Sequence, residues 1–224
     1  MYNISIKSRE IRYFVGGSKM PNWTTNKIIM NGSTEDIKKL RKTFGKKFSF
    51  NDVIHMPKCL NDFGGVPSGL AVYVGQYYKN SGKAPSIRVM KYLTRNHIYL
   101  GKLTKEQMDA SDVMYAEKAI KNLEKTGYAE WYTWSCEHWG TKWDACDSVL
   151  MDEAEDELVY AFSTAWCAPF KVFEELSMQY PDVEFECRWQ DEDDDTELGE
   201  DGEHLYHYHV YSNGNVIDNG ETEF

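Results

Sequence analysis

The sequence predicts an α+β protein in which a basic, mainly helical N-terminal lobe with a short sheet is joined to an acidic antiparallel sheet with a helix on one face. Apolar residues recur at helical spacing in the first half, whereas they alternate in several stretches of the second half. Residues 1–127 carry 22 Lys and Arg against 10 Asp and Glu, and residues 128–224 carry 3 against 26. A charge division of this size predicts regions that meet different partners or each other. We expect four segments: an N-terminal extension at 1–19, a basic α+β lobe at 20–127, a tryptophan-rich connecting helix at 128–147 and an acidic domain at 148–224.

The basic lobe is predicted to begin with a strand and a helix. The stretch "TTNKIIMNGS" predicts a strand that runs into a turn, and Ser33 precedes Asp36 by three residues, as in a capping box with Asp in place of Glu. Ile37, Leu40 and Phe44 then share one helical stripe. A short strand is expected at "FSF", residues 48–50, and helical segments between residues 70 and 96.

A longer helix follows in "SDVMYAEKAIKNLEKTG", where Ser111 or Asp112 caps the start and Gly127 stops the end. Beyond residue 156, "ELVYAFSTAW" predicts a buried strand and "PFKVFEELSMQY" a helix with Pro169 in its first turn. The alternating "VEFECRW" and the stretch "HLYHYHVY" predict further strands, and Asn213–Gly214 predicts a hairpin turn into a last one. This order of strands around one amphipathic helix is close to the ferredoxin-like split arrangement.

Residues 131–145, "WYTWSCEHWGTKWDA", hold four tryptophans. On a helix these aromatic residues cover both sides, which favours an apolar plug between the basic lobe and the acidic sheet. Cys136 and His138 are two apart and do not face each other on a helix, and one nearby lysine, Lys142, is too little for a nucleic-acid stacking platform. An open cleft lined by these indoles and ionisable groups would instead favour an enzyme. We assign five tryptophans to a structural core: Trp131, Trp134, Trp139, Trp143 and Trp166.

The most acidic stretch is "WQDEDDDTELGEDGEH". Its spacing fails as a calcium loop because Thr196 stands where Gly is needed and Gly202 where Glu is needed. One interpretation is a solvated hairpin loop. The functional interpretation is that the stretch imitates a nucleic-acid backbone and docks into a basic groove of another protein. The candidate partner-binding residues are Asp191, Glu192, Asp193, Asp194, Asp195 and Glu197. The alternative is nucleic-acid binding by Lys38, Lys39, Arg41, Lys42, Lys46 and Lys47.

We expect neither a cofactor nor a metal ion. His207 and His209 share one face of a predicted strand, but no third ligand is evident. The glycines do not form a dinucleotide-binding or phosphate-binding loop, and five widely spread cysteines predict reduced thiols. The chain has neither an apolar run of about 20 residues nor the pattern of a signal peptide, which predicts a cytoplasmic protein.

Two stretches together carry a family resemblance: "MPNWTTNKIIMNGSTEDIKKLRK…FSFNDVIHMPKCL" and "GYAEWYTWSCEHWGTKWDA…FSTAWCAPFKVFEELSMQYPDVEF". Over residues 20–217 they resemble the YubB-like or Api-type proteins of phages and plasmids, which implies a ferredoxin-like C-terminal domain. Members begin at the equivalent of "MPNW", so residues 1–19 are expected to be an addition or a start-codon artefact. Members often have Ser-Pro-Pro where this chain has Cys167, Ala168 and Pro169, a packing change. No catalytic residue is established for the family, so the resemblance assigns none.

These observations predict a non-catalytic accessory protein of a mobile element in a bacterial cytoplasm. It would bind a host macromolecule through its acidic surface, most directly a nucleic-acid-handling defence protein, as an anti-CRISPR-like protein or DNA mimic does. Nucleic-acid binding by the basic lobe is the alternative. A third possibility is a thiol or metal enzyme built on Cys136, His138, Cys146 or the pair of His207 and His209. The sequence leaves the oligomeric state open.

Overall fold

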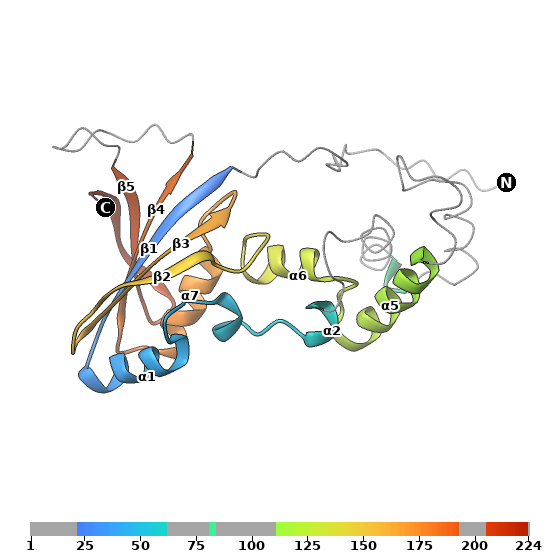
Figure 1. The fold of residues 1–224 in the computed structure, drawn as a ribbon, viewed down its shortest axis with the longest axis horizontal. Coiled ribbons are helices and arrows are strands. Elements are labelled where there is room, and N and C mark those ends of the chain that lie inside the picture. The colour runs from blue at the N-terminus through green and yellow to red at the C-terminus, as the bar shows by residue number, and fades with distance from the viewer. Residues whose placement is uncertain (1–21, 62–80, 84–110, 193–204, 224) are drawn as a thin grey trace.

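The computed structural model describes residues 22–61, 81–83, 111–192 and 205–223 (Figure 1). Its centre is a six-stranded antiparallel sheet with strand order β2-β3-β1-β4-β5-β6. The strands are β1 (Trp23–Asn31), β2 (Cys146–Glu153), β3 (Glu157–Ala165), β4 (Glu184–Asp191), β5 (Tyr206–Ser212) and β6 (Asn215–Thr222). The extension at 1–19 and the helical segments expected between residues 70 and 96 lie outside the described residues.

The helices are α1 (Thr34–Phe44), the 3₁₀ turn η1 (Phe50–Asp52), α2 (Lys58–Asn61), α5 (Ser111–Thr126), α6 (Trp131–His138) and α7 (Phe170–Gln179). In chain order, β1, α1, the β2–β3 pair, α7 and β4 form a ferredoxin-like unit, with β5 and β6 added beside β4. The predicted α+β class and the ferredoxin-like sheet are therefore confirmed. Figure 1 shows that the segment with α2, α5 and α6, inserted between α1 and β2, projects away from the sheet.

Strand β1 lies in the middle of the sheet, although the sequence placed it in the basic lobe. It pairs with β3 on one side and with β4 on the other. Ile28 and Met30 are fully buried in one core cluster with Phe173 of α7, so they lie on the helix-covered face of the sheet. The sheet thus extends across the boundary that the sequence placed at residue 148, and the basic and acidic halves of the chain share one core.

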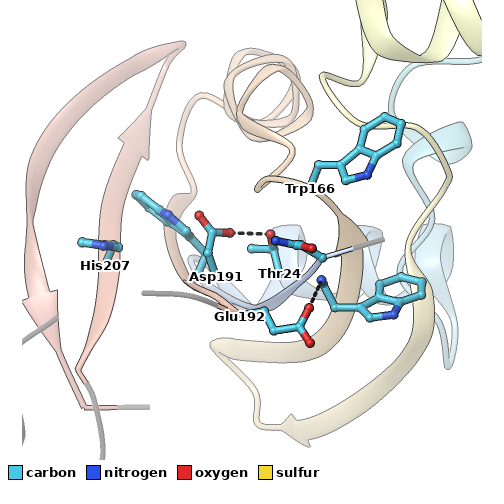
Figure 2. A pocket seen from close by; sticks show the side chains of 8 residues that line it. Thr24, Trp166, Asp191, Glu192 and His207 are labelled. Atoms are coloured by element: carbon cyan, nitrogen blue, oxygen red, sulfur yellow. Dashed lines mark hydrogen bonds between the residues drawn. The ribbon is translucent and has the colours of Figure 1, made fainter. Parts of the chain in front are cut away.

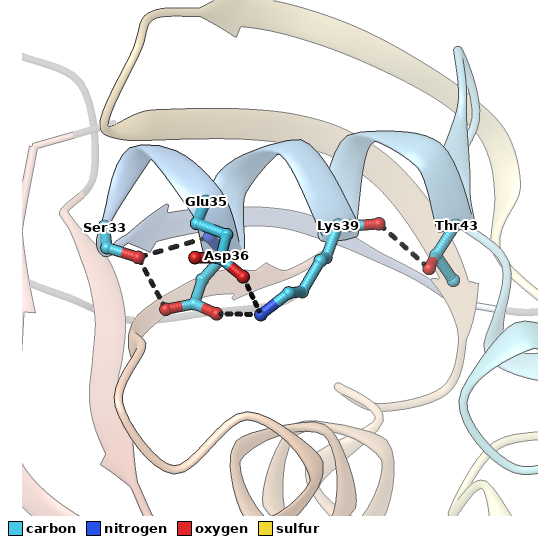
Figure 3. Close-up of polar contacts among 5 residues, drawn as sticks. All are labelled: Ser33, Glu35, Asp36, Lys39 and Thr43. Atoms are coloured by element: carbon cyan, nitrogen blue, oxygen red, sulfur yellow. Dashed lines mark hydrogen bonds and ion pairs between the residues drawn. The ribbon is translucent and has the colours of Figure 1, made fainter.

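Helix α1 begins as its sequence predicts (Figure 3). The Ser33 side chain accepts a hydrogen bond from the Asp36 backbone N–H at 3.2 Å and donates one to the Asp36 carboxylate at 2.7 Å. The hydrogen bond from Ser33, and next the one that Lys39 donates to the same carboxylate, lower the pKa of Asp36. The three residues of the predicted stripe are buried against the sheet beside α7, in one cluster with Phe173 and Leu176. The cap therefore fixes where the chain leaves β1 and turns back over the sheet.

The strand predicted at residues 48–50 is not present. The chain there leads into η1, and Phe48 and Phe50 are both buried in the core. The reason is that Asp144 replaces a strand partner: its carboxylate accepts hydrogen bonds from the Phe50 backbone N–H at 2.6 Å and from Ser49 Oγ at 2.8 Å. A side chain 94 residues away thus sets this local structure.

Strand β2 was not expected from the sequence. It is an edge strand, its register to β3 is interrupted twice, and Val149 and Met151 are exposed. Acidic residues and irregular pairing are common on edge strands because they discourage association with other sheets. Within the described ranges, no helix is both long and apolar enough to cross a bilayer.

Candidate functional site

Two of the candidate acidic residues lie at the end of β4. Asp191 is its last residue and Glu192 follows, and both are exposed. An Asp191 carboxylate oxygen accepts a hydrogen bond from Thr24 Oγ1 at 2.5 Å, and Glu192 Oε2 accepts one from the Trp23 backbone N–H at 3.1 Å. The two carboxylates therefore bind the end of β4 to the start of β1. The other candidates, Asp193, Asp194, Asp195 and Glu197, lie outside the described residues.

These carboxylates border a pocket of about 450 Å³ at this end of the sheet. Figure 2 shows Trp166 and His207 on opposite sides of it, with the carboxylates between them. Its walls come from four strand ends, and the lining residues are Asn22, Trp23, Thr24, Trp166, Trp189, Asp191, Glu192 and His207. Among these residues are three indoles and two carboxylates but neither Lys nor Arg. The pocket therefore combines flat aromatic walls with negative charge.

Trp166 corrects the sequence-based assignment to the core. Its side chain is 46% exposed, because β3 ends at Ala165 and the chain then turns toward α7. Its backbone φ is +78°, a conformation that costs a bulky L-residue about 1–2 kcal/mol. The Trp166 N–H donates a hydrogen bond to the Asn22 carbonyl at 2.9 Å. The turn at Trp166, and not burial in the core, therefore places this indole at the pocket.

Buried hydroxyl and amide groups hold that turn. Asn26, 0% exposed, donates a hydrogen bond from Nδ2 to Thr164 Oγ1 at 2.9 Å, and Thr164 Oγ1 donates to the Cys167 carbonyl at 2.8 Å. On the other side, Thr141 Oγ1 donates to the Ala165 carbonyl at 2.8 Å. The backbone directly before and after Trp166 is therefore anchored from inside the protein.

The remaining tryptophans of the predicted core differ in burial. Trp134 and Trp139 are 4% and 5% exposed and belong to the hydrophobic core, and Trp139 Nε1–H donates a hydrogen bond to the Ile54 carbonyl at 2.9 Å. Trp131 packs against that core from outside. Trp143 is half-buried, with its ring 6.0 Å from that of Trp23.

Lys142 lies beside Trp143 and Trp166. Its Nζ is 4.1 Å from the Trp143 ring centre and 5.5 Å from that of Trp166. A cation thus already stands within attractive reach of an indole that lines the pocket.

Cys136 and His138 do not form a reactive pair. Burial, and secondarily the Glu130 carboxylate, raises the pKa of the Cys136 thiol, so it is protonated at neutral pH. The His138 ring stacks on Trp134 with centres 4.2 Å apart, and its Nδ1 lies 2.9 Å from the Trp134 carbonyl. Burial, then Asp147, likewise raises the pKa of Cys146. All five cysteines are free thiols.

His207 and His209 lie at the pocket side of β5. The His209 ring packs against Trp189 with centres 4.8 Å apart and against Phe170 at 5.7 Å. Burial, and then the neighbouring His207, lowers the pKa of His209. Within the described part of the chain, no group of three or more His, Cys, Asp or Glu side chains is placed to hold a metal ion.

The candidate nucleic-acid residues lie on and after α1. Lys38, Lys42, Lys46 and Lys47 are exposed. Lys39 instead forms ion pairs with Glu35 and Asp36 at 3.1 Å, and Arg41 pairs with Glu153 at 2.8 Å. Two of the six cations are thus partly neutralised within the protein.

The sequence singled out Asp191 and Glu192 as acidic residues and His207 as one of a histidine pair, but it did not single out Trp23 or Trp189. One signal was present, because Trp189 and Asp191 are two apart on a strand and so point to the same face. Trp23 lies at the pocket because β1 pairs with β4, which puts Thr24 opposite Asp191.

Comparison with known proteins relates the C-terminal part of the chain to one family. Residues 138–223 match the family model described as the ferredoxin-like domain in Api92-like protein. A crystal structure of the protein api92 from Yersinia pseudotuberculosis is similar, with 11% sequence identity, a TM-score of 0.44, and coverage of 91% of this chain and 99% of that one. A search of curated proteins returned no match.

Proposed function

We propose that this chain is a phage- or plasmid-borne accessory protein, related to the YubB-like and Api-type proteins, that binds a host protein without catalysing a reaction. The host protein would be a nucleic-acid-handling defence protein with a basic groove. The observation that carries the proposal is the pocket at the end of the sheet, where Asp191 and Glu192 stand beside indole walls and neither Lys nor Arg contributes to the lining.

Electrostatics favours a cationic partner at this end of the molecule. The acidic run continues in the sequence directly after Glu192, and the whole chain has a net charge of −11. A negative patch steers a positive surface toward it and raises the rate of association, an effect that salt screens over about 10 Å at 0.1 M. Binding of this kind requires neither a cofactor nor a nucleophile, and the raised pKa of Cys136 is consistent with a structural thiol.

A capture experiment from host lysate tests the proposal. The tagged wild-type protein is expected to retain a host protein at about 50 mM salt and to lose most of it at about 300 mM. The double variant Asp191→Asn/Glu192→Gln is expected to retain little at either concentration. The matched control is Asp182→Asn/Glu184→Gln, which also removes two exposed carboxylates. Glu184 is the first residue of β4, at the opposite end of the strand from Asp191, and Asp182 lies two residues before it. Equal capture by both double variants would refute the role of the pocket end.

A second candidate is nucleic-acid binding through α1, favoured by the exposure of Lys38, Lys42, Lys46 and Lys47. It predicts a mobility shift of labelled DNA or RNA that weakens steeply with salt. Absence of a shift at about 50 mM salt would remove this candidate.

A further inference from the structure

Building on the proposed function, we infer that the pocket lined by Trp23, Trp166, Trp189 and Glu192 receives an arginine side chain of the partner protein. The proposal names one chemical group, the guanidinium, and one place for it, between the indole walls and the two carboxylates.

The indoles supply the first half of the recognition. Three tryptophans from β1, from β4 and from the turn after β3 line one pocket. An indole face attracts a cation within about 6 Å of the ring centre, and a guanidinium also stacks on it through its own flat face. The approach of Lys142 Nζ to 5.5 Å from the Trp166 ring centre shows that this indole is accessible to a cation.

The carboxylates supply the second half. Each accepts a hydrogen bond from β1 that helps to fix its orientation: Asp191 from Thr24 Oγ1 and Glu192 from the Trp23 N–H. A carboxylate accepts about four hydrogen bonds, so Glu192 can also accept them from the N–H groups of a guanidinium, and the negative charge of Asp191 adds to the attraction. Arginine matches this arrangement better than lysine because its donors lie in one plane and bind carboxylates in pairs.

The conformation of Trp166 is an observation independent of charge. Glycine would adopt a φ of +78° without strain, yet the chain has a large, 46% exposed aromatic residue there. Strained residues that the surrounding structure holds in place are concentrated at binding and catalytic sites. Here the buried contacts of Thr164 and Thr141 hold the strained turn, and the result is an indole at the pocket.

The pocket is large enough for an arginine side chain. About 450 Å³ lies in the lower part of the range of roughly 300–1,000 Å³ typical of small-molecule sites. The guanidinium and the methylene groups next to it fit within this space.

Titration of the full-length chain with acetyl-arginine amide, followed by the indole N–H signals in ¹H–¹⁵N NMR spectra, tests the inference. The signals of Trp23, Trp166 and Trp189, assigned with single Trp→Phe variants, are expected to shift saturably with a millimolar Kd, while those of Trp134 and Trp139 stay in place. Acetyl-citrulline amide, which has the same shape without the charge, is expected to cause no saturable shift.

Variants locate the effect. Glu192→Gln is expected to weaken arginine binding about threefold or more, and Trp166→Gly to weaken it further. Gly tolerates the backbone of the turn, so Trp166→Gly should fold, which a thermal melt checks. The control Asp182→Asn/Glu184→Gln should bind as the wild type does. Acetyl-lysine amide binding as tightly as the arginine compound, or no saturable shift with arginine, would overturn the inference.

The two proposals fail separately. Charge-dependent capture of a host protein together with an unresponsive pocket would leave the proposed function standing and remove the arginine pocket. Binding of the arginine compound without charge-dependent capture would support the chemistry of the pocket and refute the proposed function.

Discussion

Two groups of tryptophans in this protein have opposite character. Trp134 and Trp139 lie in the core, where they pack against each other with ring centres 5.3 Å apart. Trp166 lies at the pocket, with nearly half of its surface in solvent and its backbone strained. The same residue type therefore stabilises the fold in one region and is available to a ligand in the other. An aromatic-rich sequence does not distinguish these roles, because the position at which a strand ends decides whether the next indole is buried or exposed.

The largest expected difference comes from removing one indole in each region. Trp139→Ala should lower the free energy of unfolding by about 3–5 kcal/mol, because it leaves a cavity beside Phe50 and removes the hydrogen bond to the Ile54 carbonyl. Trp166→Ala should lower it by about 1 kcal/mol or less, since the side chain is largely outside the core. Urea denaturation measures both values. Similar losses in the two variants would show that the two regions do not differ in this way.

A smaller effect is expected from the contacts that hold the strained turn. Thr164→Val should cost about 1–3 kcal/mol, because Asn26 Nδ2 and the Cys167 carbonyl each lose a buried hydrogen-bond partner. The same variant should weaken arginine binding, as the turn no longer fixes Trp166. Thr25→Val, an exposed threonine of the same sheet, serves as the control and should stay within about 0.5 kcal/mol of the wild type. A stable Thr164→Val protein with full arginine binding would contradict the assigned role of this network.

The smallest effect concerns the response of the pocket end to pH. Burial lowers the pKa of His209 in the folded protein, so below about pH 6.5 the unfolded chain takes up a proton more readily than the folded one. Stability should therefore be complete above this pH and decline as the pH falls through it. Melting temperatures between about pH 8 and pH 5.5 should decline less for His209→Gln than for the wild type. Parallel curves for the two proteins would refute a contribution from this ring.

Local signals predicted much of the fold. Ser33 marks the start of α1 and Gly127, with φ +81°, the end of α5, and Asn213–Gly214 forms the expected turn between β5 and β6. Each of these features depends on residues within one or two turns of chain. Strand β2 escaped prediction because its half-exposed, acidic pattern resembles that of a loop.

Features that depend on distant residues were not predictable in this way. The central position of β1 follows from pairing with strands that lie far along the chain, and the turn at Phe50 follows from Asp144. Composition singled out Asp191 and Glu192, but the pocket that they border depends on strand pairing. The sequence assigns Trp166 to the core because the predicted buried strand runs through this residue, whereas β3 ends at Ala165 and the backbone turns at Trp166.

The central place of β1 has a consequence for synthesis on the ribosome. The contact between Thr24 and Asp191 joins residues 167 apart, so the first strand emerges long before either of its neighbours exists. Until then the apolar side chains of β1 remain exposed to solvent. A chain whose distant segments pair so late folds slowly and is prone to misassembly or to capture by chaperones. A stalled or shortened nascent chain that ends before β4 would therefore contain β1 without its partner on one side.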